Sequence, residues 1–317
     1  MAKQMLTAEQ IEATLSDNDI LDIVLDAEQE VVEAVQDCID GHILPLIIKG
    51  PPGVGKSQLI EEMTIAAGIV STDYIGSSWS APDKDSGLPA YPYHCDNLVT
   101  VKGALMRGAD YSVWALAADL YANKNGGVIC LDDNDAILRD KTAGALMMKA
   151  TEQRAVKPVS YIKANSTHEL QMYGVESTFN VDTSIIILTN LDMEEQIRIA
   201  NQNEKAGKGT KKEYISRWEA FISRGKYIDL QMNSPRSIRV YCEHKIDSVK
   251  MLTNSAYLDR TCGRSLTKKE NAEALKWIRQ NQSRLSSQLD LRTYNKLASI
   301  MIRRVNWQKS AEVSLLS

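Results

Sequence analysis

Histidine, cysteine and long apolar runs are scarce in this 317-residue chain. No stretch reaches the roughly 18 consecutive apolar residues that a membrane-spanning helix needs, which excludes an integral membrane protein. The five cysteines include no CxxC pair, which excludes a disulfide scaffold and favours reduced thiols. The opening residues MAKQMLTAEQ lack the basic and then apolar layout of a signal peptide. We therefore expect a cytoplasmic protein that makes no membrane contact.

The few histidines also limit the chemistry that the chain can perform. They are scattered, and only one has a neighbouring cysteine, so their spacing excludes a zinc site: His42, His94, His168 and His244. The sequence contains no GxSxG motif, which excludes a serine nucleophile of that kind. The functional residues must therefore belong to other motifs.

Charge is distributed unevenly along the chain, although the formal net charge is only −4. Residues 1–40 contain one lysine and eleven acidic residues, a local balance of −10. Residues 233–317 contain 16 basic and 7 acidic residues, a balance of +9. This polarity predicts either oriented contacts between regions, such as neighbouring subunits, or simply two solvated faces. The overall acidity argues against strong non-specific DNA binding, which requires a basic surface.

Apolar periodicity predicts an α/β fold. The pattern is helical over 17–40, and strands are expected at 42–49, 69–74, 126–133, 184–190 and 226–232, with further helices at 58–67, 103–122 and 135–153. Two runs that flank a polar tip predict a β-hairpin at about 156–181, and beyond Asn233 the pattern is helical only, at 234–249, 267–285 and 290–304. Alternating strands and helices indicate a mostly parallel sheet with flanking helices, followed by an all-helical domain.

Residues 50–57 read GPPGVGKS and lie between a predicted strand and a predicted helix, which is the context of a P-loop. The glycines allow backbone N–H groups to point at phosphate oxygens, and the following helix adds the positive end of its dipole. Lys56 would reach the β- and γ-phosphates, and the Ser57 hydroxyl would ligate Mg²⁺. We therefore expect ATP and Mg²⁺ to bind at Gly50, Pro51, Pro52, Gly53, Val54, Gly55, Lys56, Ser57 and Gln58.

Two carboxylates end the predicted strand 126–133. Its apolar residues predict a buried strand, whose carboxyl end would deliver Asp132 to the Mg²⁺ ion. The next residue, Asp133, would polarise the attacking water. The alternative is that these residues only cap the following helix.

Together these motifs resemble those of the AAA+ ATPases, over about residues 31–305. The resemblance implies three domains: an acidic N-terminal helical extension at 1–30, a nucleotide-binding α/β domain at 31–232 and a helical lid at 233–317. It also implies that Asn190 is the sensor 1 residue that positions the water. The family usually has glutamate where this chain has Asp133, so we expect slower hydrolysis.

The resemblance also implies two arginine roles. Arg224, just before strand 226–232, matches the arginine finger that reaches a neighbour's ATP, and Arg217 is the rival candidate. Arg292 resembles the sensor 2 arginine of the lid, and Arg236 is its rival. Each of these arginines could instead be an ordinary surface or ion-paired residue.

The predicted hairpin before the sensor strand, and a loop at 83–89 with acidic, glycine and proline residues, are similar to those of MoxR-like ATPases. The run 131–141 resembles versions encoded by bacteriophages, which would act in the bacterial host cytoplasm. This branch implies a hexameric ring that remodels a macromolecular client, often with a von Willebrand A domain partner. The hairpin tip, with Lys163, Asn165 and His168, would then face the pore or the client.

Two other functions remain open at this stage. The basic lid and the loop 205–212 would suit a DNA-directed AAA+ ATPase, such as a clamp-loader-like protein or a helicase loader. A small-molecule kinase would also use a P-loop, but it would leave the helical lid and the two arginines without a role.

Overall fold

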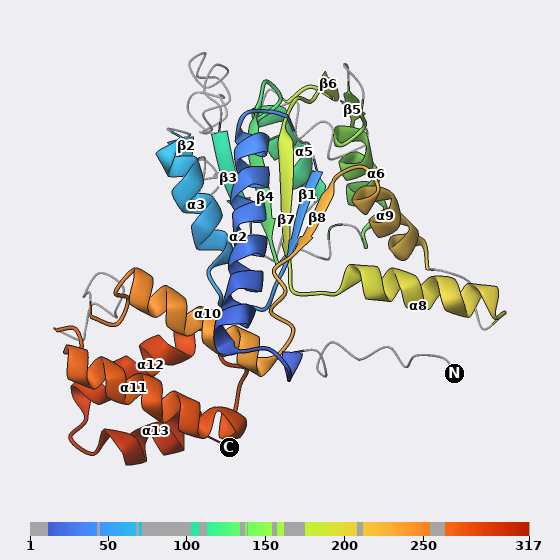
Figure 1. The fold of residues 1–317 in the computed structure, drawn as a ribbon. Coiled ribbons are helices and arrows are strands. Elements are labelled where there is room, and N and C mark those ends of the chain that lie inside the picture. The colour runs from blue at the N-terminus through green and yellow to red at the C-terminus, as the bar shows by residue number, and fades with distance from the viewer. Residues whose placement is uncertain are drawn as a thin grey trace. The chain divides into compact units, whose positions relative to one another are not determined.

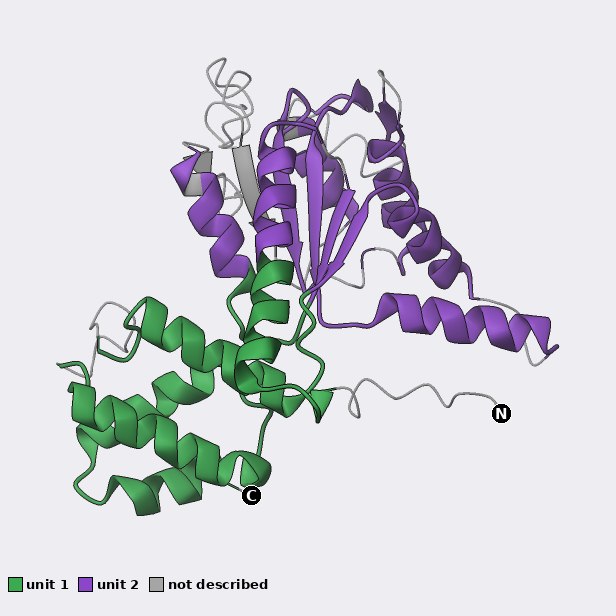
Figure 2. Cartoon of the chain, viewed as in Figure 1, with its two compact units in different colours: residues 1–28, 50–56, 230–317 green, residues 29–49, 57–229 purple. Residues whose placement is uncertain are grey.

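The computed structural model describes residues 12–42, 45–67, 70–71, 103–107, 113–133, 137, 139–153, 157–161, 175–207, 212–253 and 264–316. The chain divides into two compact units (Figure 2). Unit 1 contains residues 1–28, 50–56 and 230–317, and unit 2 contains residues 29–49 and 57–229. The P-loop segment 50–56 therefore groups with unit 1, although strand and helix residues of unit 2 precede and follow it.

The centre of unit 2 is a parallel sheet (Figure 1). In the described part of the chain it has six strands in the order β2-β3-β4-β7-β1-β8: β1 Pro45–Lys49, β2 Val70–Ser71, β3 Gly103–Arg107, β4 Gly127–Asp132, β7 Ser184–Thr189 and β8 Lys226–Asp229. All of the pairings are parallel, so the carboxyl ends of β1, β4 and β7 meet at one edge. Ligands of open parallel sheets bind at this edge.

Helices cover the sheet because its central strands are apolar on both faces. They are α2 Asp17–Ile39, α3 Lys56–Ala66, α5 Val113–Ala122, α6 Lys141–Ala150 and α9 Glu213–Ile222. α8 Met193–Lys205 follows β7, extends away from the sheet and packs against α9 (Figure 1). On one face, Ile129 of β4 and Ile185 and Ile187 of β7 join a core cluster with α5, α6 and α9. Leu120, Met147 and Trp218 contribute from these helices and are buried.

A separate two-stranded antiparallel sheet is formed by β5 Pro158–Ser160 and β6 Thr178–Asn180. It is the hairpin predicted at about 156–181, with strands of three residues each. The predicted tip residues Lys163, Asn165 and His168, like the loop 83–89, lie outside the described residues.

The helix expected over 103–122 is wrong in its first part. Gly103–Arg107 forms β3, which pairs in register with β4, so that Ala104 lies opposite Val128. Its sequence, GALMR, favours a helix locally, but pairing between two neighbouring strands outweighs that propensity. The helix expected over 135–153 is also shorter: α6 begins at Lys141, because the Asp140 carboxylate accepts from the N–H groups of Thr142 and Ala143 and caps it.

Unit 1 is helical, as predicted for the C-terminal part, and the α/β prediction for the rest is likewise confirmed. Besides the first turns of α2 it contains α10 Pro235–Ser248, α11 Lys268–Asn281, the 3₁₀ turn η5 Gln282–Arg284, α12 Leu291–Arg303 and α13 Trp307–Leu315. Its core includes Trp277 of α11, whose ring lies 6.5 Å from that of Trp307. Among the described helices, none combines the length and apolar character needed to cross a bilayer.

Candidate active site

The P-loop has the backbone that its glycines permit. Gly53 and Gly55 have φ values of 71° and 97°, a region that residues with a side chain rarely adopt. Between them, Val54 is 2% exposed and anchors the loop from inside. The helix α3 begins at Lys56, so the loop leads directly into a helix N-terminus, where unpaired N–H groups favour an anion.

The Lys56 ammonium lies over the same loop. Its Nζ donates to the carbonyl oxygens of Gly50 and Pro51 at 2.8 and 2.9 Å. These contacts hold the cation on the loop that the sequence assigns to phosphate. Gln58, the last predicted binding residue, is exposed and donates its side-chain amide to Glu62 on α3, so its side chain supports the helix.

Within unit 1, the P-loop also contacts the start of α12. The N–H of Leu291 donates to the Gly53 carbonyl at 3.1 Å. Asp290, the N-cap of α12, lies so close that a β-carbon on Gly53 would come within 2.3 Å of its Oδ2. Gly53 is therefore required both for its positive φ and for this contact. Asp290 was not predicted, although Asp290-Leu-Arg-Thr has the pattern of a helix start.

The side chains of Ser57 and Asp132 meet in unit 2. The Ser57 hydroxyl donates to Oδ2 of Asp132 at 2.5 Å, which joins the first turn of α3 to the end of β4. A hydroxyl oxygen and a carboxylate oxygen are ligands that Mg²⁺ accepts, usually together with phosphate oxygens and water. Both side chains are partly buried and point at one another, so this pair fits the Mg²⁺ ion that the sequence predicts.

Asp133 and Asn190 form a second pair in unit 2. The Asn190 side-chain amide, one residue beyond β7, donates to Oδ1 of Asp133 at 2.6 Å. The N–H of Asp133 donates to the Leu188 carbonyl at 3.2 Å, so it extends the β4–β7 ladder by one residue. Asp133 has a φ of 50°, in the left-handed region that residues other than glycine seldom occupy. Asp133 is exposed.

An ion cluster that no sequence motif indicates lies at the carboxyl ends of the strands in the same sheet. Lys49, the last residue of β1, donates to Asp192 at 2.7 Å and to Asp229 at 2.6 Å. Burial opposes the charge of Lys49, but the two carboxylates outweigh it and raise its pKa. Burial also opposes the charge of Asp192, but Lys49 and the N–H of Glu195 together outweigh it and lower the pKa of that carboxyl group. The cluster joins β1, β8 and the N-cap of α8 beside the Asn190 turn.

Arg224 lies at the amino ends of the strands, opposite the carboxyl ends where Ser57, Asp132 and Asn190 lie. It precedes β8, and Gly225 beside it packs on the first residue of β1: a β-carbon there would come within 2.0 Å of the Pro45 carbonyl oxygen. One strand length of about 15 Å separates this position from Lys49 at the other end of β1. The Arg224 guanidinium donates to the Met148 carbonyl near the end of α6 at 2.8 Å. It is therefore remote from Ser57, Asp132 and Asn190 of its own chain.

Arg217, the rival finger, is held on α9. Its guanidinium donates to the Arg139 carbonyl at 3.0 Å and pairs with Glu213 at 3.2 Å, and its side chain is 14% exposed. Arg217 and Arg224 are thus both partly exposed, and each donates to a main-chain carbonyl of unit 2.

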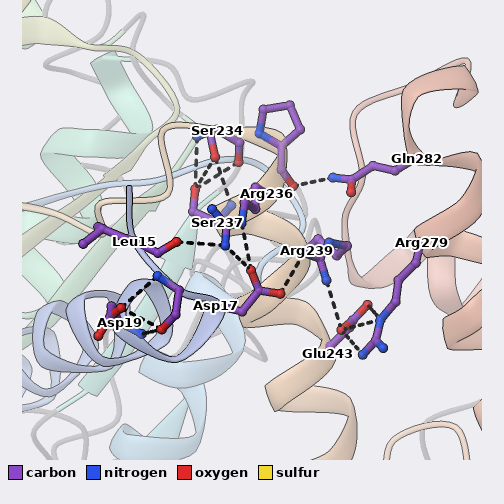
Figure 3. A network of polar contacts seen from close by, with 12 residues as sticks. Leu15, Asp17, Asp19, Ser234, Arg236, Ser237, Arg239, Glu243, Arg279 and Gln282 are labelled. Atoms are coloured by element: carbon purple, nitrogen blue, oxygen red, sulfur yellow. Dashed lines mark hydrogen bonds and ion pairs between the residues drawn. The ribbon is translucent and has the colours of Figure 1, made fainter. Parts of the chain in front are cut away.

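The two lid arginines have different surroundings within unit 1. Arg292 is exposed in the first turn of α12, two residues after Asp290, which touches the P-loop. Arg236 of α10 instead donates to the Leu15 carbonyl and forms an ion pair with Asp17 at 2.7 Å (Figure 3). Its guanidinium is thus committed to the N-terminal segment, whereas Arg292 lies beside the P-loop.

No family model matches the chain, and no curated protein matches its sequence. Among solved structures, domain III of the replication initiation protein DnaA from Thermotoga maritima is similar, with a TM-score of 0.39 and 10% identity over 90% of each chain. A structure described as a DNA replication initiation factor gives a TM-score of 0.34 and 12% identity, and covers 90% of this chain and 63% of that one. Both TM-scores are low, so neither likeness carries an argument about function.

Proposed function

We propose that this chain is an AAA+ ATPase that binds ATP with Mg²⁺ and hydrolyses it to ADP and phosphate. The observation that carries the proposal is the Ser57–Asp132 contact of 2.5 Å, directly after a P-loop in which Gly53 and Gly55 have the required positive φ. When bound, Mg²⁺ would neutralise charge on the phosphates. Phosphoryl transfer depends mainly on positioning and charge stabilisation, so the rest of the chemistry belongs to the side chains around this pair.

Each side chain of the site has one task in this proposal. The P-loop N–H groups and Lys56 bind the phosphates, and Ser57 and Asp132 hold the metal. Asp133 accepts the proton of the attacking water, and the Asn190 amide fixes the direction of its carboxylate.

Two arginines outside the P-loop, Arg224 and Arg292, have roles in this proposal. We assign the finger role to Arg224, because its place at the far edge of the sheet suits action on a neighbour's ATP and not on its own. We assign the sensor 2 role to Arg292, because it lies in the helix turn whose first N–H bonds to Gly53. Arg236 is less suitable for the sensor 2 role, because its guanidinium is bound to Leu15 and Asp17. Arg217 remains the alternative finger, since it and Arg224 each donate to a main-chain carbonyl of their own unit.

Within the superfamily, we propose the MoxR-like branch, on the basis of the β5–β6 hairpin that precedes β7. Such a protein forms a ring, most often a hexamer, and remodels a macromolecular client in a chaperone-like role. A von Willebrand A domain protein is the partner that this resemblance suggests. The bacteriophage-like character of the chain is part of the same proposal.

A DNA-directed ATPase is the second candidate, because unit 1 exposes basic residues such as Arg303, Arg304 and Lys309. The two candidates differ in a simple assay, the ATPase rate against protein concentration with and without single- and double-stranded DNA. A steep rise with concentration and no effect of DNA supports the remodelling ring. Strong stimulation by DNA favours the loader function instead.

The substitution Lys56→Ala tests the site itself. We expect it to abolish nucleotide binding or turnover, because the substitution removes the ammonium group that would bind the phosphates at the P-loop. Binding of a fluorescent ATP analogue and phosphate release measure the two effects. Lys268→Ala, an exposed lysine of α11, is the matched control and should behave as the wild type. Normal ATPase activity of the Lys56 variant would overturn the site assignment.

A further inference from the structure

The outer face of α2 is a continuous acidic surface. Five exposed acidic residues follow one another at intervals of three or four residues, which places them on one side of the helix: Asp22, Asp26, Glu30, Glu33 and Asp37. We call them the acidic face. The helix contains no basic residue of its own, and in the described part of the chain only Glu30 of these five takes an ion pair, with Lys226. Like charges at this spacing destabilise a helix, so neutralising this face stabilises α2.

Unit 1 contains a surface of opposite character. A groove of about 700 Å³ lies between the end of α12 and α13. Its basic residues are Lys296, Arg303, Arg304 and Lys309, and none of the described residues that line it is acidic. Val305 next to the groove and Val313 in its wall are 99% and 81% exposed. We call this surface the basic groove.

We propose that the acidic face of one copy of this chain docks into the basic groove of a second copy. The two surfaces have complementary charge, and they come from the same two regions that give the chain its −10 and +9 charge balance. Ile23, at the edge of the acidic face, is 43% exposed and supplies an apolar contact for Val305 and Val313. A nucleic acid is the less suitable occupant, because the protein is acidic overall and its acidic face would repel phosphates.

The two surfaces are different, so the contact is head to tail. Each copy offers one acidic face and one basic groove, and repetition of such a contact closes into a ring or continues as a filament. The inference rests on the assembly in the proposed function and identifies residues that would join neighbours. It is independent of the nucleotide site, because none of these side chains belongs to that site.

Charge exchange between two variants tests the contact. The first variant carries Glu33→Lys and Asp37→Lys, and the second carries Arg304→Glu and Lys309→Glu. We expect each variant alone to self-associate at least about tenfold more weakly than the wild type, because its contact now joins like charges. A mixture of the two should assemble again, because each basic face then meets an acidic groove. Sedimentation velocity at low and high ionic strength measures this, and salt should weaken the wild-type contact.

The controls separate this inference from the proposed function. Lys268→Glu with Lys269→Glu makes the same change of charge at the exposed start of α11 and should leave self-association unaltered. Circular dichroism and binding of the fluorescent ATP analogue establish that every variant is folded and has an intact nucleotide site. A mixture no stronger than either variant alone, or a wild type that remains monomeric at every concentration, would overturn the contact. Loss of DNA binding by the groove variant with wild-type self-association would assign the groove to nucleic acid instead.

Discussion

Asp133 is held in an unfavourable backbone conformation by its hydrogen bond to β7 and by the Asn190 side chain. A φ of 50° is uncommon for a residue with a side chain, and such positions are destabilising by about 1–3 kcal/mol. The hydrogen bonds to Leu188 and from Asn190 oppose that strain. Aspartate and asparagine tolerate the left-handed region better than other side chains do, because their short polar groups bond locally. The backbone here thus favours a small polar residue at the position of the proposed base.

The substitution Asp133→Asn should therefore separate folding from catalysis. Asparagine keeps the shape and the backbone preference, and its carbonyl oxygen still accepts from Asn190. We expect an unchanged melting temperature and ATP affinity, with hydrolysis lowered about 100-fold or more because the base is lost. Single-turnover phosphate release measures the rate. Asp133→Val is the contrasting variant, which should melt at a lower temperature, and equal hydrolysis by the Asn variant would contradict the role of Asp133.

At the residue scale, the sequence predicts those site residues that belong to a recognisable motif. Ser57, Asp132 and Asn190 follow apolar strands or a P-loop, and the parallel order of β4 and β7 brings the ends of these strands together. The ion cluster of Lys49 could not be predicted in the same way. Its partners Asp192 and Asp229 are far along the chain, and only the register of β1 with β8 makes them neighbours.

At the scale of elements, α11 shows how a local pattern fixes the start of a helix. Thr267 and Glu270 form a reciprocal capping box, and Arg264 pairs with Glu270 at 2.8 Å. Together, chiefly through the hydrogen bond from Arg264, these contacts lower the pKa of Glu270 from its ordinary value of 4.5 to about 2. A depressed carboxyl pKa stabilises the folded state fully above pH 4.5, and this stabilisation is lost as the pH falls towards about 2.

The substitution Glu270→Gln should destabilise unit 1 by about 0.5 kcal/mol at neutral pH, because glutamine can keep the capping box but loses the ion pair with Arg264. The difference from the wild type should disappear as the pH approaches about 2, where the wild-type carboxylate is protonated. Urea denaturation at a series of pH values gives this dependence. Glu273→Gln, an exposed acid on the same helix, is the control. A difference that persists at low pH would contradict the stabilising role of the Glu270 charge.

Helices and strands with an apolar period or a capping residue of their own could be predicted. Those that form only through pairing with other strands, or that have little apolar periodicity, could not. The strands β4 and β7 and the helix α12 lie where the apolar pattern predicts them. β3 was missed because its residues prefer a helix until β2 and β4 pair with it. The prediction also omitted α8, α9 and α13. In α8 the described residues include only one buried side chain, Met193, so there is little apolar periodicity to detect.

At the scale of the whole molecule, the position of Arg224 predicts that hydrolysis depends on assembly. Arg224→Ala should bind ATP normally but fail to hydrolyse it, because each copy keeps its own site and cannot complete its neighbour's. Mixing this variant with Asp133→Asn should restore part of the activity, because an intact site then meets an intact finger. Phosphate release at a series of mixing ratios tests this, with Arg217→Ala in place of Arg224→Ala as the comparison. No recovery at any ratio would count against a finger that acts in trans.

β8 is a short covalent link between the proposed finger and the helical part of the chain. The strand is only four residues long, with Arg224 two residues before it and Leu230, the first residue after the unit boundary, just after it. It pairs in register with β1 along its whole length. Tightly packed interiors transmit strain and compress little. If Arg224 acts on a neighbour's ATP, β8 is therefore the shortest path along the chain from the helical part to that arginine.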